Sequence, residues 1–225
     1  MHIALFDLDG TITRHDTFVP YVVRLLLRRP WQTLRLLGVV PALVRFVIRR
    51  ADHGAVKAAL LRSALRGRSR AELDAWTNEF VPRLIARGTF ARALEVIAQH
   101  RGKGDRLVLL SASPDLYVPA IARALGFDEA ICTGVGWDGD RLDGALSTPN
   151  RRGEEKARCV EALRRRHPGV AIVAYANGAA DLPHLQLVDR PLLVNASPAV
   201  RRRAEGLGIP TASWRSSVSG RKAEG

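Results

Sequence analysis

The sequence predicts an α/β protein with a doubly wound, mostly parallel sheet (a Rossmann-like core) and an all-helical cap inserted after the first strand. Short apolar runs alternate with helical segments along most of the chain. These runs are continuous rather than alternating, as in parallel strands that are covered on both faces. About ninety residues after the first run carry no strand signal, which indicates a helical insertion.

The predicted core elements are five strands and three helices. The strands cover residues 3–7, 106–111, 130–133, 171–176 and 191–195. The helices cover residues 116–125, 154–166 and 198–205. The stretch GWDGDRLDG at residues 136–144 predicts a hairpin turn.

The insertion is predicted to be a cap of residues 18–97. One helix is expected to begin at Asp52 and to end by Gly67. Ser69 and Glu72 then form a capping box ahead of apolar residues at helical spacing.

The catalytic core is accordingly expected to be discontinuous. It comprises residues 1–17 and 98–214, and residues 215–225 form a polar tail that we expect to be disordered.

The composition indicates an anionic partner. The 225 residues include 35 Lys and Arg against 22 Asp and Glu, a formal net charge of +13. Nucleic acid, a phospholipid surface or a phosphorylated substrate would each fit this charge. Scattered arginines without an aromatic stacking platform argue against nucleic acid. The two cysteines form no metal-spaced set and the N-terminus has no signal-type hydrophobic stretch, so we expect a cytoplasmic protein.

The stretch LFDLDGTIT places two carboxylates, Asp7 and Asp9, at the end of the first apolar run. Two carboxylates this close repel each other unless a cation or a shared proton separates them. The pair therefore either binds a metal ion or divides the two roles of an acid–base reaction. Ligands of such a sheet bind beyond the carboxyl ends of its strands, which is where this pair lies.

Three further positions offer polar groups at the ends of predicted elements. Ser111 ends the second strand, Lys156 lies in the first turn of a helix, and Asn177 follows a strand with Asp181 four residues later. Together with the Asp7 and Asp9 pair, these groups suit a phosphate held beside an oxygen-liganded cation such as Mg²⁺.

These motifs, in this order, resemble the haloacid dehalogenase (HAD) superfamily of phosphohydrolases. The motifs are DxDGT, an apolar run ending in Ser, a Lys, and a strand followed by a short acidic motif. The helical insertion directly after the first motif resembles the phosphoserine phosphatase-like branch. The resemblance implies a Mg²⁺-dependent phosphatase that acts through an aspartyl-phosphate intermediate.

The resemblance also implies a role for each site residue. Asp7 would be the nucleophile, and Asp9 would protonate the leaving alkoxide and then deprotonate water. The groups that would hold the phosphoryl oxygens are Ser111, Lys156 and the backbone N–H groups near Leu8, Asp9 and Ala112, with Gly10 beside them. Mg²⁺ would be held by Asp7, the Asp9 carbonyl and Asn177. Thr11 would fix the loop, and Asp181 would orient metal-bound water or pair with Lys156.

Two positions depart from the pattern of this branch. Ala176-Asn177 stands where Gly-Asp is usual, so one negative charge is lost and metal affinity is expected to fall unless Asp181 compensates. Ala180 stands where phosphoserine phosphatases generally carry Asn. A weakened phosphatase, or a basic anion-binding module on a disabled hydrolase fold, is therefore an alternative.

The substrate stays open at this point. Asp16 aligns with the acidic residue that binds the substrate amino group in phosphoserine phosphatases, although it is one methylene shorter. Asp16 can equally cap the first helix of the insertion. A soluble phosphomonoester such as phosphoserine and a phospholipid headgroup phosphate are both compatible with the sequence.

The start of the cap, residues 18–50, is rich in Leu, Val and Arg. Its longest uncharged stretch has nine residues, far fewer than a membrane span needs. The arginines that fall broadly on one side of a helical wheel are Arg24, Arg28, Arg35, Arg45 and Arg49. This pattern is typical of a helix at the inner face of a membrane, and equally of a cap helix that buries its apolar side on its own cap. The segment also resembles the insertion of phosphatidylglycerophosphate phosphatases.

Overall fold

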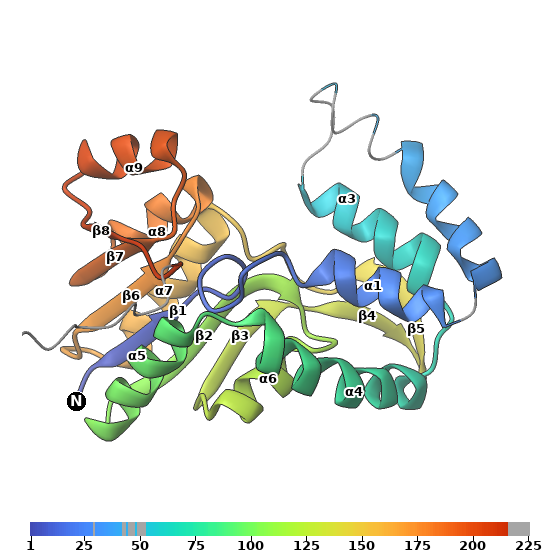
Figure 1. Ribbon diagram of the computed structural model, residues 1–225, viewed down its shortest axis with the longest axis horizontal. Helices are drawn as coiled ribbons and strands as arrows, with labels where there is room; N and C mark the ends of the chain where they lie inside the picture. The colour runs from blue at the N-terminus through green and yellow to red at the C-terminus, as the bar shows by residue number, and fades with distance from the viewer. Residues whose placement is uncertain (29, 42–43, 45–47, 49–52, 216–225) are drawn as a thin grey trace, which may run out of the picture.

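The computed structural model describes residues 1–28, 30–41, 44, 48 and 53–215. At its centre lies a six-stranded parallel sheet with the strand order β3-β2-β1-β6-β7-β8 (Figure 1). Its strands are β1 (Ile3–Phe6), β2 (Arg106–Pro114), β3 (Glu129–Thr133), β6 (Ile172–Ala176), β7 (Arg190–Val194) and β8 (Thr211–Ala212). The predicted fold class and the five predicted strands are confirmed, and β8 is an additional short edge strand.

Helices cover both faces of the sheet because its strands are apolar on both sides. Ala4 and Phe6 of β1 pack into one hydrophobic cluster, and Ile3 and Leu5 pack into a second cluster. Buried residues of α5 (Ala91–Gly102) and α6 (Val118–Leu125) join the first cluster. Those of α7 (Glu154–Arg166) and α8 (Leu182–Leu185) join the second, and α9 (Pro198–Glu205) packs beside β8. The fold is therefore doubly wound.

The strand order changes direction at β1, because β2 and β3 are added on one side of it and β6, β7 and β8 on the other. This strand pairs with β2 on one side and with β6 on the other, so that Phe6 lies opposite both Leu109 and Tyr175. The residues that follow β1, β2 and β6 therefore meet at one edge of the sheet, which is the crevice where open α/β sheets bind ligands.

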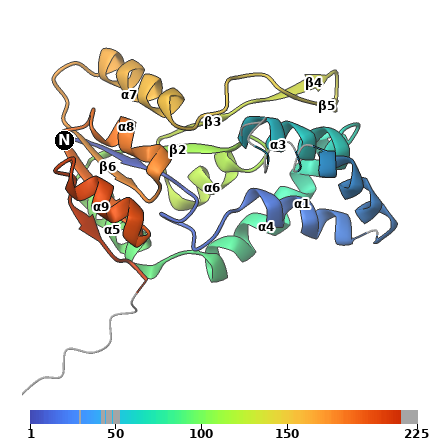
Figure 2. The same ribbon diagram turned by 90° about the horizontal axis from the view of Figure 1, so that it is seen from above.

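The cap is helical, as predicted, and extends to one side of the sheet (Figures 1 and 2). Its elements are α1 (Phe18–Leu27), the 3₁₀ helix η1 (Pro30–Val39), α3 (His53–Leu60), the π-helical turn η2 (Leu61–Leu65) and α4 (Arg70–Gly88). The Ser69 hydroxyl caps α4 by accepting a hydrogen bond from the Glu72 N–H at 3.2 Å, which confirms the serine half of the predicted capping box. The Glu72 carboxylate pairs with Arg68.

The hairpin of β4 (Val135–Asp138) and β5 (Arg141–Leu146) contacts η2 and α3, so the cap packs against an extension of the core. Its turn lies within the predicted hairpin segment. Aromatic side chains join the cap to the core, with Tyr21 of α1 stacked on Tyr117 at a ring-centroid distance of 4.7 Å.

Some expectations cannot be compared with the structure. The helix start at Asp52, Arg45, Arg49 and residues 216–225 lie outside the described residues, as does the side chain of Arg35. The predicted cap boundary at residue 97 falls inside α5, which packs against β2. No helix among the described residues is both long enough and apolar enough to cross a membrane.

Candidate active site

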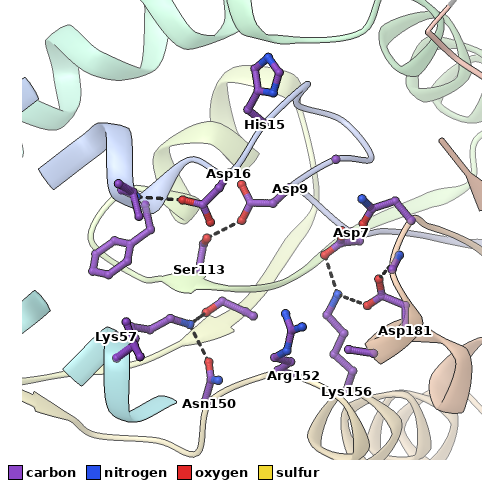
Figure 3. A pocket seen from close by; sticks show the side chains of 18 of the residues that line it. Asp7, Asp9, His15, Asp16, Lys57, Ser113, Asn150, Arg152, Lys156 and Asp181 are labelled. Carbon is purple, nitrogen blue, oxygen red and sulfur yellow. Dashed lines mark hydrogen bonds and ion pairs between the residues drawn. The ribbon is translucent and has the colours of Figure 1, made fainter. Parts of the chain in front are cut away.

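A cavity of about 560 Å³ lies at the carboxyl edge of the sheet, between the core and the cap (Figure 3). The motifs that end β1, β2 and β6 all contribute to its wall, and so do α1 and α3 of the cap. Of the ten predicted site residues, eight line the cavity and two, Thr11 and Ser111, do not. Motifs far apart in the sequence are thus brought together.

Asp7 is held rigidly at the base of this cavity. Its backbone N–H donates to the Tyr175 carbonyl at 2.9 Å, which fixes the first residue after β1 against the neighbouring strand. The Thr11 hydroxyl donates to Asp7 Oδ2 at 3.1 Å. Lys156 Nζ donates to Asp7 Oδ1 at 2.5 Å. Thr11 lies beneath the cavity wall and orients the Asp7 carboxylate from there.

Lys156 stands in the first turn of α7, as predicted, and is only 3% exposed. Its ammonium also donates to Asp181 Oδ1 at 2.7 Å, and Asp181 Oδ2 accepts from the Gly178 N–H at 2.9 Å. Burial alone would lower the pKa of Lys156, but Asp181 and Asp7 outweigh burial and raise it. Burial raises the pKa of Asp7 against the pull of Lys156, whereas Lys156 overcomes burial and lowers the pKa of Asp181.

Asp9 faces the cavity beside Asp7 and is held by Thr17, directly before α1, and by Ser113 of β2. Its Oδ1 accepts from the Thr17 N–H at 2.8 Å, and its Oδ2 accepts from the Ser113 hydroxyl at 2.7 Å. Burial, reinforced by the nearby charge of Asp16, raises the pKa of Asp9 to about 7. A carboxyl group with such a pKa can both donate and accept a proton near neutral pH.

Gly10 and Asn177 lie in close contact across the β1–β6 junction. Gly10 has a φ of +80°, and a Cβ atom at this position would lie only 1.9 Å from Asn177 Nδ2. The side chain of Asn195, after β7, donates to the Gly10 carbonyl at 3.1 Å and fixes the same loop. Glycine is thus required here by the backbone conformation and by the space that Asn177 occupies.

The oxygen groups around Asn177 fit a hard cation. The Asn177 amide lines the cavity with Asp7 and Asp181, and it forms no hydrogen bond with any residue that the structure describes. Among the described residues, no group of three His, Cys, Asp or Glu side chains could hold a metal ion. A cation at this position would therefore be bound by amide and carbonyl oxygens together with the carboxylates. Mg²⁺ accepts such a set because it retains several waters and substrate oxygens.

The position of Asp16 is compatible with both roles that the sequence left open. Its Oδ1 accepts from the Val19 N–H at 2.9 Å, which is a capping bond in the first turn of α1. Asp16 also lines the cavity, on the side where Asp9 lies (Figure 3). This hydrogen bond supports the helix-capping role. Because Asp16 also lines the cavity, its carboxylate stays within reach of a bound substrate.

Ser111, predicted to contact the phosphoryl group, is not itself among the residues that line the cavity. Ser111 is 1% exposed and lies beneath the cavity wall, where its hydroxyl accepts from the Ser113 N–H at 3.0 Å. Ala112 and Ser113 line the cavity in its place. The reason is that β2 continues to Pro114, so its carboxyl end lies beyond the serine that closes the apolar run.

Lys57 is a cavity residue that the sequence reasoning missed. It lies on α3 of the cap and reaches across to the core, donating to the Ala112 carbonyl and, at 2.6 Å, to Asn150 Oδ1. Burial lowers the pKa of Lys57 to about 8, even though Asp9 and Asp16 oppose this shift. The only sequence signal was one lysine inside the apolar stretch AVKAALL.

The cavity is electrostatically divided. In Figure 3 the carboxylates of Asp16, Asp9 and Asp7 run along one side, and Lys57, Arg152 and Lys156 run along the other, where Asp181 pairs with Lys156. An anion with several oxygens is attracted to the cationic side, while its reacting atom faces the carboxylates. This arrangement suits a phosphoryl group presented to Asp7 with Asp9 alongside.

Comparisons with known proteins agree with this geometry. The family model of haloacid dehalogenase-like hydrolases matches residues 4–186. Protein CicA of Caulobacter vibrioides is 32% identical over 196 residues, which is 83% of each chain. Phosphoserine phosphatase SerB1 of Mycobacterium tuberculosis is 27% identical, over 93% of this chain and 75% of the relative.

A solved structure from Bordetella pertussis, of a protein with unknown function, has a closely similar fold. It superposes with a TM-score of 0.80 at 25% identity, covering 94% of this chain and 98% of the other. The similarity therefore includes the cap as well as the sheet.

Proposed function

The chain belongs to the haloacid dehalogenase-like hydrolases, and we propose that it is a phosphatase that hydrolyses a phosphomonoester through an aspartyl-phosphate on Asp7. One observation carries this proposal. The Asp7 carboxylate is held by Thr11 and Lys156 at the base of an open cavity, with the pKa of neighbouring Asp9 raised to about 7. The phosphatase name of the mycobacterial relative supports the same activity.

In the first half-reaction, an Asp7 oxygen attacks phosphorus and the bond from phosphorus to the leaving oxygen breaks. Asp9, in its protonated form, gives its proton to that leaving oxygen. The product alcohol is released and Asp7 carries the phosphoryl group. Thr17 and Ser113 hold Asp9 in position for this transfer, because each donates a hydrogen bond to a different oxygen of its carboxyl group.

In the second half-reaction, Asp9 is a carboxylate and takes a proton from water as that water attacks phosphorus. The bond between phosphorus and Asp7 breaks, which restores the Asp7 carboxylate and releases inorganic phosphate. A pKa near 7 suits both steps, since a single group must act first as an acid and then as a base.

Charge on the transferring group is balanced by residues of the core. Lys156 and Arg152 supply positive charge on the side of the cavity opposite Asp9. Asp7, the Asp9 carbonyl and Asn177 would hold Mg²⁺, and Asp181 would orient its waters. When bound, Mg²⁺ would neutralise charge between the nucleophile and the phosphoryl oxygens.

The cap supplies the contacts that select the leaving group. Two charged residues face the cavity from this side. Lys57 of α3 is cationic, and Asp16, just before α1, is anionic. A small soluble phosphomonoester whose leaving group carries an anionic group fits Lys57, and an additional ammonium, as in phosphoserine, fits Asp16.

The proposal is tested by release of phosphate from p-nitrophenyl phosphate with and without Mg²⁺. We expect Mg²⁺-dependent turnover that Asp7→Asn abolishes and that Asp138→Asn, an exposed aspartate on β4, leaves unchanged. If wild type and Asp7→Asn are equally inactive across divalent metals and a panel of phosphoamino acids, sugar phosphates and lipid phosphates, the anion-binding alternative replaces this proposal.

A further inference from the structure

A row of exposed apolar side chains runs along η1 of the cap. Trp31, Leu34 and Leu37 are 69%, 68% and 66% exposed. A 3₁₀ helix has three residues per turn, so side chains three positions apart lie directly above one another. The three side chains therefore form one continuous ridge, and Val40, directly after η1, is a further exposed apolar residue at 49%.

Exposed apolar residues are concentrated in this part of the molecule. Among the residues that the structure describes, ten large hydrophobic side chains are exposed, and eight of them lie between positions 19 and 48. These eight are Val19, Leu27, Trp31, Leu34, Leu37, Val40, Val44 and Ile48. Scattered single residues of this kind are ordinary, but such a concentration marks an interaction surface.

The charge of the same segment favours an anionic partner. Residues 18–50 contain seven arginines and neither Asp nor Glu. Arg24 of α1 is exposed on that helix, three positions before the exposed side chain of Leu27 and thus on the same side of the helix. A second copy of this chain would bring two such arginine-rich segments together, and their like charges oppose that contact.

We propose that the exposed face of α1 and η1 docks onto an anionic lipid bilayer surface. Tryptophan and leucine side chains enter the boundary between headgroups and acyl chains, while arginines bind lipid phosphates. Val19 is also exposed on α1 and lines the catalytic cavity, so docking of this helix brings the cavity mouth close to the lipid surface. The inference does not depend on the proposed phosphatase activity.

Trp31 provides a specific reporter for this contact. It is 69% exposed, whereas Trp76 and Trp214 are 4% and 6% exposed and lie within the hydrophobic core. The fourth tryptophan, Trp137 of β4, is half-buried and packs against Arg70. We expect tryptophan emission to shift to shorter wavelength when vesicles of phosphatidylglycerol and phosphatidylcholine are added. The shift should be absent from Trp31→Phe and from wild type mixed with phosphatidylcholine vesicles alone.

Vesicle flotation measures binding directly. Leu34→Glu/Leu37→Glu should lower the fraction of protein floating with anionic vesicles about tenfold, because burying two carboxylates at the lipid boundary opposes insertion. Leu207→Glu, an exposed leucine outside the cap, is the matched control and should float like wild type. Turnover of p-nitrophenyl phosphate in solution should be equal in all three proteins, which verifies the fold.

Raising the salt concentration from about 0.05 M to about 0.5 M should weaken flotation, since arginine–phosphate attraction is screened. Absence of flotation by the wild type at low salt overturns the proposal. So does equal flotation of the double variant and wild type. A concentration-dependent dimer in sedimentation that Leu34→Glu/Leu37→Glu abolishes would identify a second copy, instead of lipid, as the partner.

Discussion

Lys156 Nζ lies 2.5 Å from Asp7 Oδ1, and the same ammonium lies 2.7 Å from Asp181 Oδ1. One buried cation thus compensates two buried carboxylates at the base of the cavity. Because all three groups are removed from water, the charges are stable only as a set. Lys156 opposes the rise in the pKa of Asp7 that burial causes, and so favours the carboxylate form that the proposed nucleophile requires.

Lys156→Met is expected to cost about 3 kcal/mol of unfolding free energy at neutral pH, because it leaves two buried carboxylates uncompensated. Both would then have pKa values above those of the unfolded chain, so the folded state binds more protons than the unfolded state. Stability of this variant should therefore fall as pH rises from about 4 to 7. Urea unfolding at several pH values measures the effect.

A double variant separates charge from packing. Lys156→Met/Asp181→Asn removes one of the two uncompensated carboxylates and should recover part of the lost stability at pH 7. If Lys156→Met shows the same deficit at every pH and the double variant recovers none of it, the cost arises from packing and not from the ion triad.

Ser113→Ala should shift the pH dependence of kcat/KM. The Ser113 hydroxyl donates to Asp9 Oδ2 at 2.7 Å and so stabilises the carboxylate form. Removing this bond raises the pKa of Asp9 above its value of about 7. Since the first half-reaction needs protonated Asp9, the fall in kcat/KM on the alkaline side should move to higher pH. Initial rates between pH 5 and 9 measure the profile.

Ser147→Ala, in the loop after β5, serves as a control because Ser147 does not line the cavity. It should reproduce the wild-type pH profile. A shift of the Ser113→Ala profile to lower pH would contradict the assignment of Asp9 as the acid.

Asn177→Asp should strengthen Mg²⁺ binding. The amide lies beside Gly10 at the cavity wall and carries no charge, so an additional carboxylate increases attraction for a divalent cation. We expect the Mg²⁺ concentration for half-maximal activity to fall about tenfold, and to rise in Asn177→Ala. An unchanged Mg²⁺ dependence in both variants would show that position 177 does not contact the metal.

Lys57→Met should affect substrates according to their leaving group. For an ester with an anionic leaving group, such as phosphoserine, kcat/KM should fall about tenfold, because one charge-assisted hydrogen bond to the substrate is removed. Turnover of p-nitrophenyl phosphate should change little. Lys103→Met, at an exposed lysine that follows α5, provides the control.

The pH dependence gives an independent check on Lys57. Its pKa is lowered to about 8, so the wild-type KM for phosphoserine should increase as pH rises through 8 and the ammonium loses its proton. This increase should be absent in Lys57→Met and displaced to higher pH in Lys57→Arg. An identical KM profile in all three proteins would remove Lys57 from substrate recognition.

Much of the core was predictable because its elements follow local rules. The continuous apolar runs identify the strands of the core, and polar residues after β1 and β6 mark the ligand edge of the sheet. Lys156 could be placed because it lies in the first turn of a clearly bounded helix. These features depend on residues that are close together in the sequence.

The rest depends on long-range contacts that no local pattern encodes. Lys57 meets Asn150 only because the cap folds back over the core, and these two residues are 93 positions apart. Ser113 was missed because the end of β2 was placed at Ser111, where the apolar run stops. A second hydroxyl two residues later, directly before Pro114, was the available signal.

The central claim is that Asp7 becomes covalently phosphorylated. The most direct measurement mixes the enzyme with Mg²⁺ and substrate, quenches the reaction in acid within milliseconds, and locates the phosphoryl group by peptide mass spectrometry. We predict a phosphoryl group on Asp7 that is absent from Asp7→Asn and accumulates in Asp9→Asn when p-nitrophenyl phosphate, whose leaving group needs little protonation, is the substrate. Turnover with no phosphorylated residue at any quench time, or with the phosphoryl group on another residue, would contradict the account.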